Sequence, residues 1–214
     1  FYMIGVYGGS FDPIHFGHIN PLFELSDIFD FHKIRLIPTY NSPVNKVFYS
    51  DIEHRLNMVS IISASDTNVF VADDTEMRKG GISYTYETIQ IIKKQEQNHD
   101  ICLIMGLDAF LSLENWYNYT EILNDIRLIV VNRPDSNIKE IKKMNFEILD
   151  RITSNKIDFQ KNEKKQIFFY ETPSINISSS DIRRRINCKE SLEGLIPGSI
   201  LSYIERNKLY TDLT

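Results

Sequence analysis

Residues 8–18 read Gly8-Gly9-Ser10-Phe11-Asp12-Pro13-Ile14-His15-Phe16-Gly17-His18, and they lie between an apolar run of strand length and an amphipathic helical pattern. The glycines at the start of this stretch leave room for the backbone to approach a ligand closely. A helix that begins near His18 would point its free N–H groups and its positive dipole end at this loop, which favours phosphate. The imidazoles of His15 and His18 can donate hydrogen bonds to phosphate oxygens, and the small Gly17 lets a nucleotide lie against the backbone. The stretch therefore predicts a phosphate-binding turn after a first strand.

Other interpretations of this stretch have less support. It lacks the third glycine of a dinucleotide-binding fingerprint and the Gly-Lys-Ser/Thr of a Walker loop. Two histidines three residues apart, with no third ligand nearby, are poor evidence for a metal site. A Gly-Gly pair after a strand is often an ordinary turn. The position between a strand and a helix favours a nucleotide site, because open α/β sheets bind ligands where the strand order switches, and the first strand normally lies beside that switch.

Short apolar runs alternate with helix-length segments through most of the chain. We expect strands at 3–7, 34–38, 69–72, 101–105, 128–131 and 167–170, where β-branched and aromatic residues are frequent. We expect helices at 18–29, 55–63, 85–95, 116–124 and 180–186, the second of them after a capping box at Ser50-Asp51-Ile52-Glu53. This alternation predicts an α/β fold with a doubly wound, mainly parallel sheet and helices on both faces.

The chain length favours a single domain over residues 1–214. Residues 135–165 break the alternation, and we interpret them as a solvated insertion with a helix from Ile138 to about Ile152. A C-terminal helical part covers about 178–210. Its last helix, Pro197 to Lys208, has an apolar stripe that we expect to pack on the sheet.

Composition narrows the class of protein. The formal net charge of -5 counts against a module for polyanionic nucleic acid, but it is compatible with a locally basic pocket. Cys102 lies in an apolar run and is expected to be buried, and with Cys188 it offers neither a disulfide framework nor metal-ligand spacing, which favours the cytoplasm. No apolar stretch approaches the ~20 residues of a membrane span, and no segment resembles a signal peptide.

A second polar motif lies late in the chain, at Ile177-Ser178-Ser179-Ser180-Asp181-Ile182-Arg183-Arg184-Arg185. Ser179 or Ser180 is a good N-cap for a helix, and free N–H groups, hydroxyls and a guanidinium together suit a triphosphate. Arg184 and Arg185 turn to other helix faces than Arg183, so we expect them to be exposed or structural. Taken alone, the stretch is equally well an ordinary helix start with a basic first turn. Together with the first loop, it favours a phosphate site.

The two motifs resemble the signatures of the nucleotidylyltransferase superfamily with the His-x-Gly-His motif, and Ser180 stands where threonine is more usual. The resemblance implies a Rossmann-like fold and transfer of a nucleotidyl group from a nucleoside triphosphate. It implies catalytic roles for His15, His18 and Arg183. It also implies an ATP site formed by Gly8, Gly9, Ser10, Phe11, His15, His18, Gly106, Asp108, Ile177, Ser179, Ser180 and Arg183.

The middle of the chain resembles one group of this superfamily, the bacterial nicotinate mononucleotide adenylyltransferases. The resemblance rests on Ser83-Tyr84-Thr85, on Gly106-Leu107-Asp108 with Trp116 downstream, and on the closing Leu209-Tyr210. It implies that backbone N–H groups near Thr85 recognise the pyridine carboxylate. The implied mononucleotide site consists of Ser10, Asn41, Lys46, Ser83, Tyr84, Thr85, Trp116, Tyr117 and Arg133.

Two positions leave alternatives open. By the resemblance Trp116 stacks on the pyridine ring, but a lone tryptophan is more often a core residue. The loop at 38–46 departs from the family pattern, since Asn45 stands where histidine is common, and this departure affects the phosphate contacts assigned to Asn41 and Lys46.

The implied reaction is direct attack of the mononucleotide's 5′-phosphate oxygen on the α-phosphorus of ATP, with pyrophosphate leaving in line. Mg²⁺ would bridge the phosphates mostly through water, so no protein metal ligands are expected. The expected partners are ATP and nicotinate mononucleotide, without nucleic acid or membrane, for a cytoplasmic monomer or homodimer. The alternatives are nicotinamide mononucleotide or phosphopantetheine as acceptor, a non-catalytic nucleotide sensor, and a nucleic-acid-binding module. The intact His15, His18 and Arg183 argue against the sensor.

Overall fold

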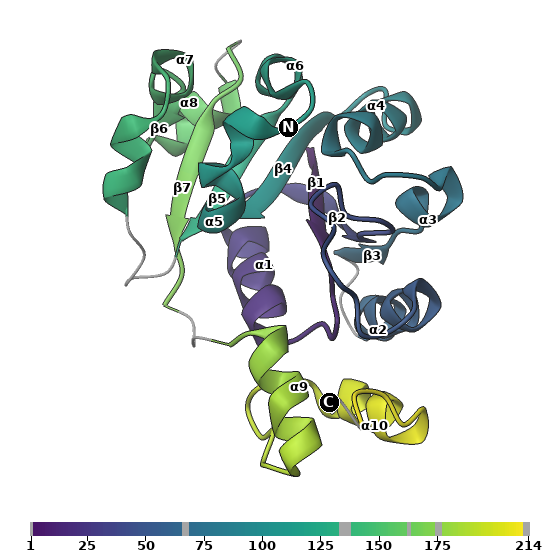
Figure 1. Ribbon diagram of the computed structural model, residues 1–214. Helices are drawn as coiled ribbons and strands as arrows, with labels where there is room; N and C mark the ends of the chain where they lie inside the picture. Colours follow the sequence, from purple (N-terminus) through teal and green to yellow (C-terminus); the bar gives the residue numbers. More distant parts are fainter. Residues whose placement is uncertain (1, 66–68, 133–137, 162–163, 174–176, 212–214) are drawn as a thin grey trace.

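The computed structural model describes residues 2–65, 69–132, 138–161, 164–173 and 177–211. Within these ranges the chain forms one open sheet of seven strands in the order β3-β2-β1-β4-β5-β7-β6, and each neighbouring pair is parallel (Figure 1). The strands are β1 (Met3–Gly9), β2 (Phe31–Pro38), β3 (Phe70–Ala72), β4 (Asp100–Gly106), β5 (Arg127–Asn132), β6 (Ile152–Thr153) and β7 (Ile167–Glu171). All six expected strands are confirmed, and β6 is additional.

The strand order reverses between β1 and β4. The chain winds outward from β1 through β2 to β3 on one side, and from β4 through β5 on the other. Ligands of open α/β sheets bind in the crevice at such a switch point. The loop that follows Gly9 and the helix that follows Gly106 begin there, which confirms the expected place of the first strand.

Helices cover both faces of the sheet, as expected. One face carries α1 and α2, whose apolar side chains form a core with Cys102 and Ile104 of β4. The other face carries α4, α5 and α6, which form a second core with Ile101, Leu103 and Met105. Residues 101–105 are therefore apolar throughout, because successive side chains of a strand point to opposite faces and here both faces are covered.

The described helices differ in length and none is both long and apolar enough to cross a membrane. They are α1 (Phe16–Ile28), α2 (Ile52–Ala64), α3 (Thr75–Lys79), α4 (Thr85–Gln95), α5 (Leu107–Leu111), α6 (Tyr119–Asp125), α7 (Phe146–Leu149), α8 (Lys156–Lys161), α9 (Ser179–Cys188) and α10 (Gly198–Arg206), with 3-10 turns η1 (Leu113–Asn115) and η2 (Ile138–Lys143).

Several helices start at other residues than expected, and two of these differences have a clear structural cause. The expected capping box at Ser50 is wrong, because α2 begins after Asp51 with no side-chain cap and the Ser50 hydroxyl donates to Asp12 instead (2.6 Å between oxygens). The helix expected at 116–124 begins later, at Tyr119, because Trp116 still belongs to the end of η1.

The helix expected from Ile138 to about Ile152 is wrong. The described residues of the segment 135–165 form η2, α7, β6 and α8, and β6 pairs with β7 at the edge of the sheet. Phe159 of α8 is fully buried, with its ring centroid 5.3 Å from that of Phe29 and 5.6 Å from that of Phe168. The segment therefore contributes to the core rather than forming a solvated insertion. Its periodicity is weak because each short element buries only one or two side chains.

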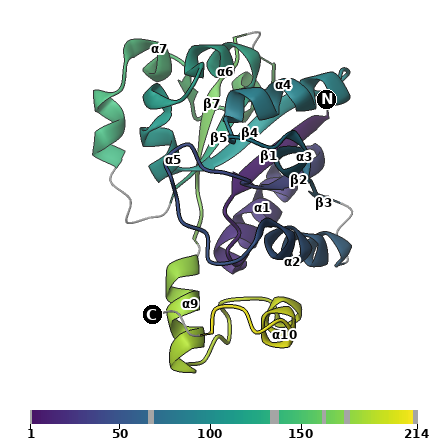
Figure 2. The same cartoon turned by 45° about the vertical axis from the view of Figure 1, so that its right-hand side comes forward.

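The C-terminal helices α9 and α10 lie beside each other, apart from α4 to α7 (Figures 1 and 2). The expectation that α10 packs on the sheet is wrong, because α10 packs on α2. The Tyr203 hydroxyl of α10 lies 2.9 Å from Nδ1 of His54 and accepts a hydrogen bond from the Asn57 amide at 3.0 Å. The apolar stripe of α10 buries Ile200 and Ile204 in the core that α1 and α2 share.

Candidate active site

Tight packing fixes the start of the loop after β1. Phe11 is fully buried with a φ of 48°, and its ring lies 3.0 Å from where a Cβ on Gly9 would be. The Thr39 N–H donates to the Gly9 carbonyl (2.8 Å), which joins this loop to the one after β2. An added Cβ on Gly8 would meet nothing within 4 Å, so the backbone at Gly8 has open space beside it.

His15 and His18 face each other at the start of α1, with ring centroids 3.8 Å apart and ring planes tilted by 31°. The helix begins at Phe16, two residues before the expected start, and His15 is its N-cap. The His15 N–H donates to Nδ1 of His18 (3.3 Å), which links the two residues. A Cβ on Gly17 would lie 3.0 Å from the His15 ring and 3.3 Å from Cβ of Ile177. The second sequence motif therefore lies directly against the first.

The second motif also docks on the first loop through side chains of α9. The Ser179 hydroxyl donates to the carbonyl of Pro13 (3.0 Å). Arg183 donates through Nη1 to the carbonyl of Asp12 (2.6 Å), and its Nη2 lies 3.3 Å from Oγ of Ser180. Residues more than 160 positions apart in the sequence thus form one polar surface beside the two histidines.

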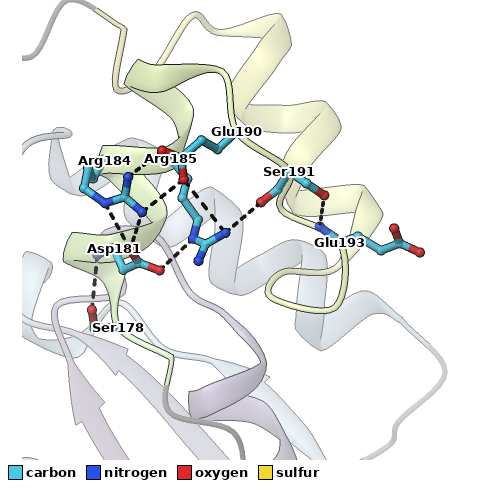
Figure 3. Close-up of polar contacts among 7 residues, drawn as sticks. All are labelled: Ser178, Asp181, Arg184, Arg185, Glu190, Ser191 and Glu193. Carbon is cyan, nitrogen blue, oxygen red and sulfur yellow. Dashed lines mark hydrogen bonds and ion pairs between the residues drawn. The ribbon is translucent and has the colours of Figure 1, made fainter.

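The other arginines of this motif have a structural role. Ser178, not Ser179 or Ser180 as expected, caps α9 by accepting a hydrogen bond from the Asp181 N–H (3.1 Å). Arg184 and Arg185 both pair with Asp181, and Arg184 also pairs with Glu190 (Figure 3). Hydrogen bonds from these guanidinium groups lower the pKa of both Asp181 and Glu190. Arg184 and Arg185 therefore bind within α9 and to the segment that follows it, whereas Arg183 contacts the first loop.

Two segments expected to bind the mononucleotide meet each other. Oγ of Ser83 accepts hydrogen bonds from the N–H groups of Tyr40 and Asn41 at 3.1 and 3.2 Å, and the Ser83 N–H donates to the Asn41 carbonyl at 2.8 Å. The Ser83 hydroxyl is buried by these contacts, so it holds the two loops together. Thr85 is the first residue of α4, as expected, so the first-turn N–H groups of that helix follow directly on this junction.

Aromatic side chains border the same junction. The Tyr84 ring lies 5.0 Å from the ring of Tyr117, which is 51% exposed. Trp116 is half-buried on the second core, and its Nε1 donates to Oγ of Ser112 (3.0 Å). The structure thus places Tyr117 against the 83–85 loop and gives Trp116 core contacts on one side, between the two alternatives that the sequence left open.

Residues 6–185 match the model of the cytidylyltransferase-like family. The chain belongs to this family. Two curated relatives match it almost from end to end, and both are named probable nicotinate-nucleotide adenylyltransferase. The protein of Methylococcus capsulatus is 31% identical over 97% of this chain and 99% of its own length. The protein of Vesicomyosocius okutanii is 34% identical over 95% of this chain and 94% of its own.

A solved structure shares the fold of this cytidylyltransferase-like chain. It is the nicotinic acid mononucleotide adenylyltransferase of Plasmodium falciparum complexed with NaAD, which is similar with a TM-score of 0.74 at 20% sequence identity, over 98% of both chains. This likeness confirms the expected Rossmann-like fold.

Five expected site residues of this family member remain to be placed. Gly106 and Asp108 are exposed at the carboxyl end of β4, beside the switch point. Lys46 is exposed in the loop after β2. The carbonyl of Ser10 accepts a hydrogen bond from Nη1 of Arg55 at 3.0 Å. Arg133 lies outside the described residues.

Arg55 organises the candidate site, although it was not among the predicted site residues. Its side chain is 1% exposed, and its Nη1 donates to the carbonyls of Ser10 (3.0 Å) and Thr39 (2.7 Å), so it joins the loops after β1 and β2. Burial lowers the pKa of Arg55. A signal was present, because Arg55 occupies the first position of the apolar stripe that continues at Met58, Val59 and Ile62.

Glu76 of α3 is the second missed residue. Its carboxylate is buried and accepts hydrogen bonds from the Tyr40 N–H (3.2 Å), the Thr88 hydroxyl (3.0 Å) and the Ser83 hydroxyl. Burial raises the pKa of Glu76. No sequence signal marks it, because its three partners come from separate segments that only the folded chain brings together.

Proposed function

We propose that this cytidylyltransferase-like protein is a nicotinate-nucleotide adenylyltransferase. It transfers AMP from ATP to nicotinate mononucleotide in NAD biosynthesis, and the products are nicotinate adenine dinucleotide and pyrophosphate. One observation carries the proposal beyond family membership: Ile177 and Arg183 of the late motif lie against Gly17 and Asp12 of the first loop, beside the switch point of the sheet. The curated relatives, which match at least 95% of the chain, support the choice of substrate.

The chemistry requires positioning and charge stabilisation rather than a covalent intermediate. A 5′-phosphate oxygen of the mononucleotide forms a bond to the α-phosphorus of ATP, and the bond from that phosphorus to the bridging oxygen of pyrophosphate breaks. His18, with His15 beside it, donates to the transferring phosphate as negative charge builds. Arg183 and Ser179 hold the β- and γ-phosphates, at the N-terminus of α9.

The acceptor half of the site is assigned to the junction of the loops at 39–41 and 83–85. The N–H groups of the first turn of α4, near Thr85, suit a carboxylate, since they lack partners within the helix and lie at its positive dipole end. The exposed Tyr117 ring and the half-buried Trp116 provide apolar surface for a pyridine ring beside Tyr84. This arrangement supports the acid rather than the amide as acceptor.

We assign Mg²⁺ to the triphosphate rather than to the protein. Within the described ranges, no group of three or more His, Cys, Asp or Glu is arranged to hold a metal. The ion would enter bound to ATP and would neutralise part of the phosphate charge. Water would supply most of its remaining ligands. Both cysteines are free thiols, which suits a cytoplasmic enzyme. We propose a monomer or a homodimer as its state.

The test is pyrophosphate release from ATP and Mg²⁺ with nicotinate mononucleotide and nicotinamide mononucleotide offered in parallel. Faster turnover with the acid is the expected result. A preference for the amide would overturn the assignment of the carboxylate to Thr85 but keep the reaction. Turnover with phosphopantetheine alone would overturn the substrate, and tight ATP binding without turnover on any acceptor would favour a nucleotide sensor.

A further inference from the structure

The side chain of Asp12 lies inside the first loop and has no part in the proposed reaction. It is 2% exposed, and its carboxylate accepts three hydrogen bonds: from the Tyr49 N–H (2.6 Å), from the Ser50 hydroxyl (2.6 Å) and from the Tyr210 hydroxyl (2.8 Å). These donors come from the end of the loop after β2 and from the C-terminal segment after α10. Asp12 therefore joins the first loop to two distant parts of the chain.

The main chain of the same residue holds Arg183. Its carbonyl accepts the hydrogen bond from Nη1 of Arg183 at 2.6 Å. The guanidinium carbon of Arg183 also lies 4.0 Å from the centre of the Tyr49 ring, within the range of a cation–π contact. Both contacts of the guanidinium therefore depend on Asp12. The Asp12 carbonyl binds Arg183 directly, and the Asp12 carboxylate binds the backbone N–H of Tyr49, whose ring contacts the guanidinium.

We propose that Tyr49 and Tyr210 are positioning residues for Arg183. Tyr49 supplies the ring on which the guanidinium rests, and Tyr210 fixes the Asp12 carboxylate that holds Tyr49 in place. The inference rests on the proposed function, in which Arg183 holds the β- and γ-phosphates of ATP. It predicts that both tyrosines affect ATP and not the mononucleotide.

The surroundings of Tyr210 show that its position is closely determined. The side chain is 3% exposed, and its hydroxyl lies 3.1 Å from Oγ of Ser50 as well as donating to Asp12. Its φ is 62°, a backbone region that bulky residues rarely adopt. Burial and the nearby Asp12 raise the pKa of Tyr210, so the hydroxyl remains a donor at neutral pH.

Paired variants of Tyr49 give the first test. In Tyr49→Leu the backbone N–H that Asp12 accepts remains, but the ring under Arg183 is lost. We expect kcat/KM for ATP to fall about fourfold, as for a cation–π contact on a half-exposed ring, while KM for nicotinate mononucleotide stays within twofold of the wild-type value. Tyr49→Phe keeps the ring and should restore wild-type kinetics. Wild-type ATP kinetics in Tyr49→Leu, or equal losses in the leucine and phenylalanine variants, would overturn the role of the ring.

A matched pair of C-terminal tyrosines gives the second test. Tyr210→Phe removes the hydroxyl on Asp12, and Tyr203→Phe removes a hydroxyl that contacts His54 and Asn57 on α2. Both variants lose a hydroxyl contact between the C-terminal part of the chain, α10 or the segment after it, and the rest of the protein. Thermal unfolding of each variant therefore measures how much stability that contact contributes. Only Tyr210→Phe should raise KM for ATP, by about fivefold. Equal ATP kinetics in the two variants, or a loss in Tyr210→Phe that affects both substrates alike, would overturn the proposal.

ATP affinity separates this proposal from the proposed function. If the wild-type protein fails to release pyrophosphate with any acceptor, the proposed function is wrong. Calorimetric titration of the same full-length variants with ATP and Mg²⁺ then tests the positioning role alone. Weaker ATP binding in Tyr49→Leu and Tyr210→Phe, with unchanged binding in Tyr49→Phe and Tyr203→Phe, supports it, and uniform binding across the four variants contradicts it.

Discussion

Gly17 and Ile177 lie so close together that a Cβ on Gly17 would be 3.3 Å from Cβ of Ile177. The same added atom would lie 3.0 Å from Nδ1 and Cε1 of the His15 ring. Gly17 is therefore the point where the histidine loop and the late motif touch, and a side chain there has no space unless one of the two moves.

The first prediction concerns this contact. Gly17→Ala should displace the His15 ring or the segment at Ile177, and a shift of this kind at reacting groups costs roughly a hundredfold in turnover. Steady-state pyrophosphate release measures kcat. Gly198→Ala is the matched control, because an added Cβ there meets nothing within 4 Å and should leave kcat unchanged. A Gly17→Ala enzyme as active as the control would show that the two motifs need not touch during catalysis.

The second prediction concerns His18. If its imidazole stabilises the charge that builds on the transferring phosphate, His18→Ala should lower kcat by roughly 10²- to 10³-fold with little change in thermal stability. His99→Ala is a suitable control, because His99 stacks on His32 beside the amino end of β4, at the opposite end of the strand from the candidate site. Full turnover in His18→Ala would remove this residue from the mechanism.

The third prediction separates the acceptor half of the site from the ATP half. Glu76 accepts hydrogen bonds from the Tyr40 N–H and the Ser83 and Thr88 hydroxyls, and these described partners do not include the proposed ATP residues. Glu76→Gln turns one acceptor oxygen into an NH₂ group that faces donors. KM for nicotinate mononucleotide should therefore rise about tenfold, with KM for ATP unchanged. The control is Glu205→Gln on the exposed face of α10, and a change in KM for ATP alone would contradict the assignment.

The fourth prediction follows from the raised pKa of Glu76. Its carboxyl has an ordinary pKa of about 4.3 in the unfolded chain, and burial raises the pKa in the folded protein. Between these two pKa values the folded protein keeps a proton that the unfolded chain has released, so the free energy of unfolding decreases as pH rises. The stabilising contribution is complete below the unfolded pKa and is lost as pH rises through the folded pKa.

Urea unfolding over a range from about pH 4 to about pH 8 measures this effect. Glu76→Gln does not titrate, so the difference in free energy of unfolding between wild type and variant should shift in favour of the variant as pH rises. A difference that stays constant across this range would show that Glu76 titrates alike in the folded and unfolded states.

The fold was largely predictable because it depends on local patterns. The run 101–105 is apolar at every position, which identified a strand covered on both faces, and α4 begins and ends at the expected residues. The segment after Asn132 was not predictable in the same way. Its η2, α7, β6 and α8 are too short for a clear period, and their order depends on packing against β7 and Phe29.

The candidate site also contains residues that the sequence predicted and residues that it did not. His15, His18 and Arg183 were found because they occur within motifs that are continuous in the sequence. Arg55 was missed because it acts through the backbone carbonyls of Ser10 and Thr39, in loops after other strands. Glu76 was missed because it combines a backbone N–H from another loop with two hydroxyls from the start of α4 and the loop before it. Backbone partners can be of any residue type, so they leave no pattern of their own in the sequence. The one signal was the charged Arg55 at the first position of the apolar stripe of α2.

The sequence by itself determined the alternation of strands and helices, the parallel sheet, the nucleotide loop after β1 and the basic start of α9. These features follow from hydrophobic periodicity and from short motifs, which act over a few neighbouring residues. Only the tertiary structure decided that Ser50 binds Asp12 instead of capping a helix, and that Tyr210 closes the loop that holds Arg183. Ser50 and Tyr210 lie 38 and 198 residues from Asp12. Contacts over such separations form only when the chain has folded, because a buried carboxylate is stable only when buried donors bind to it.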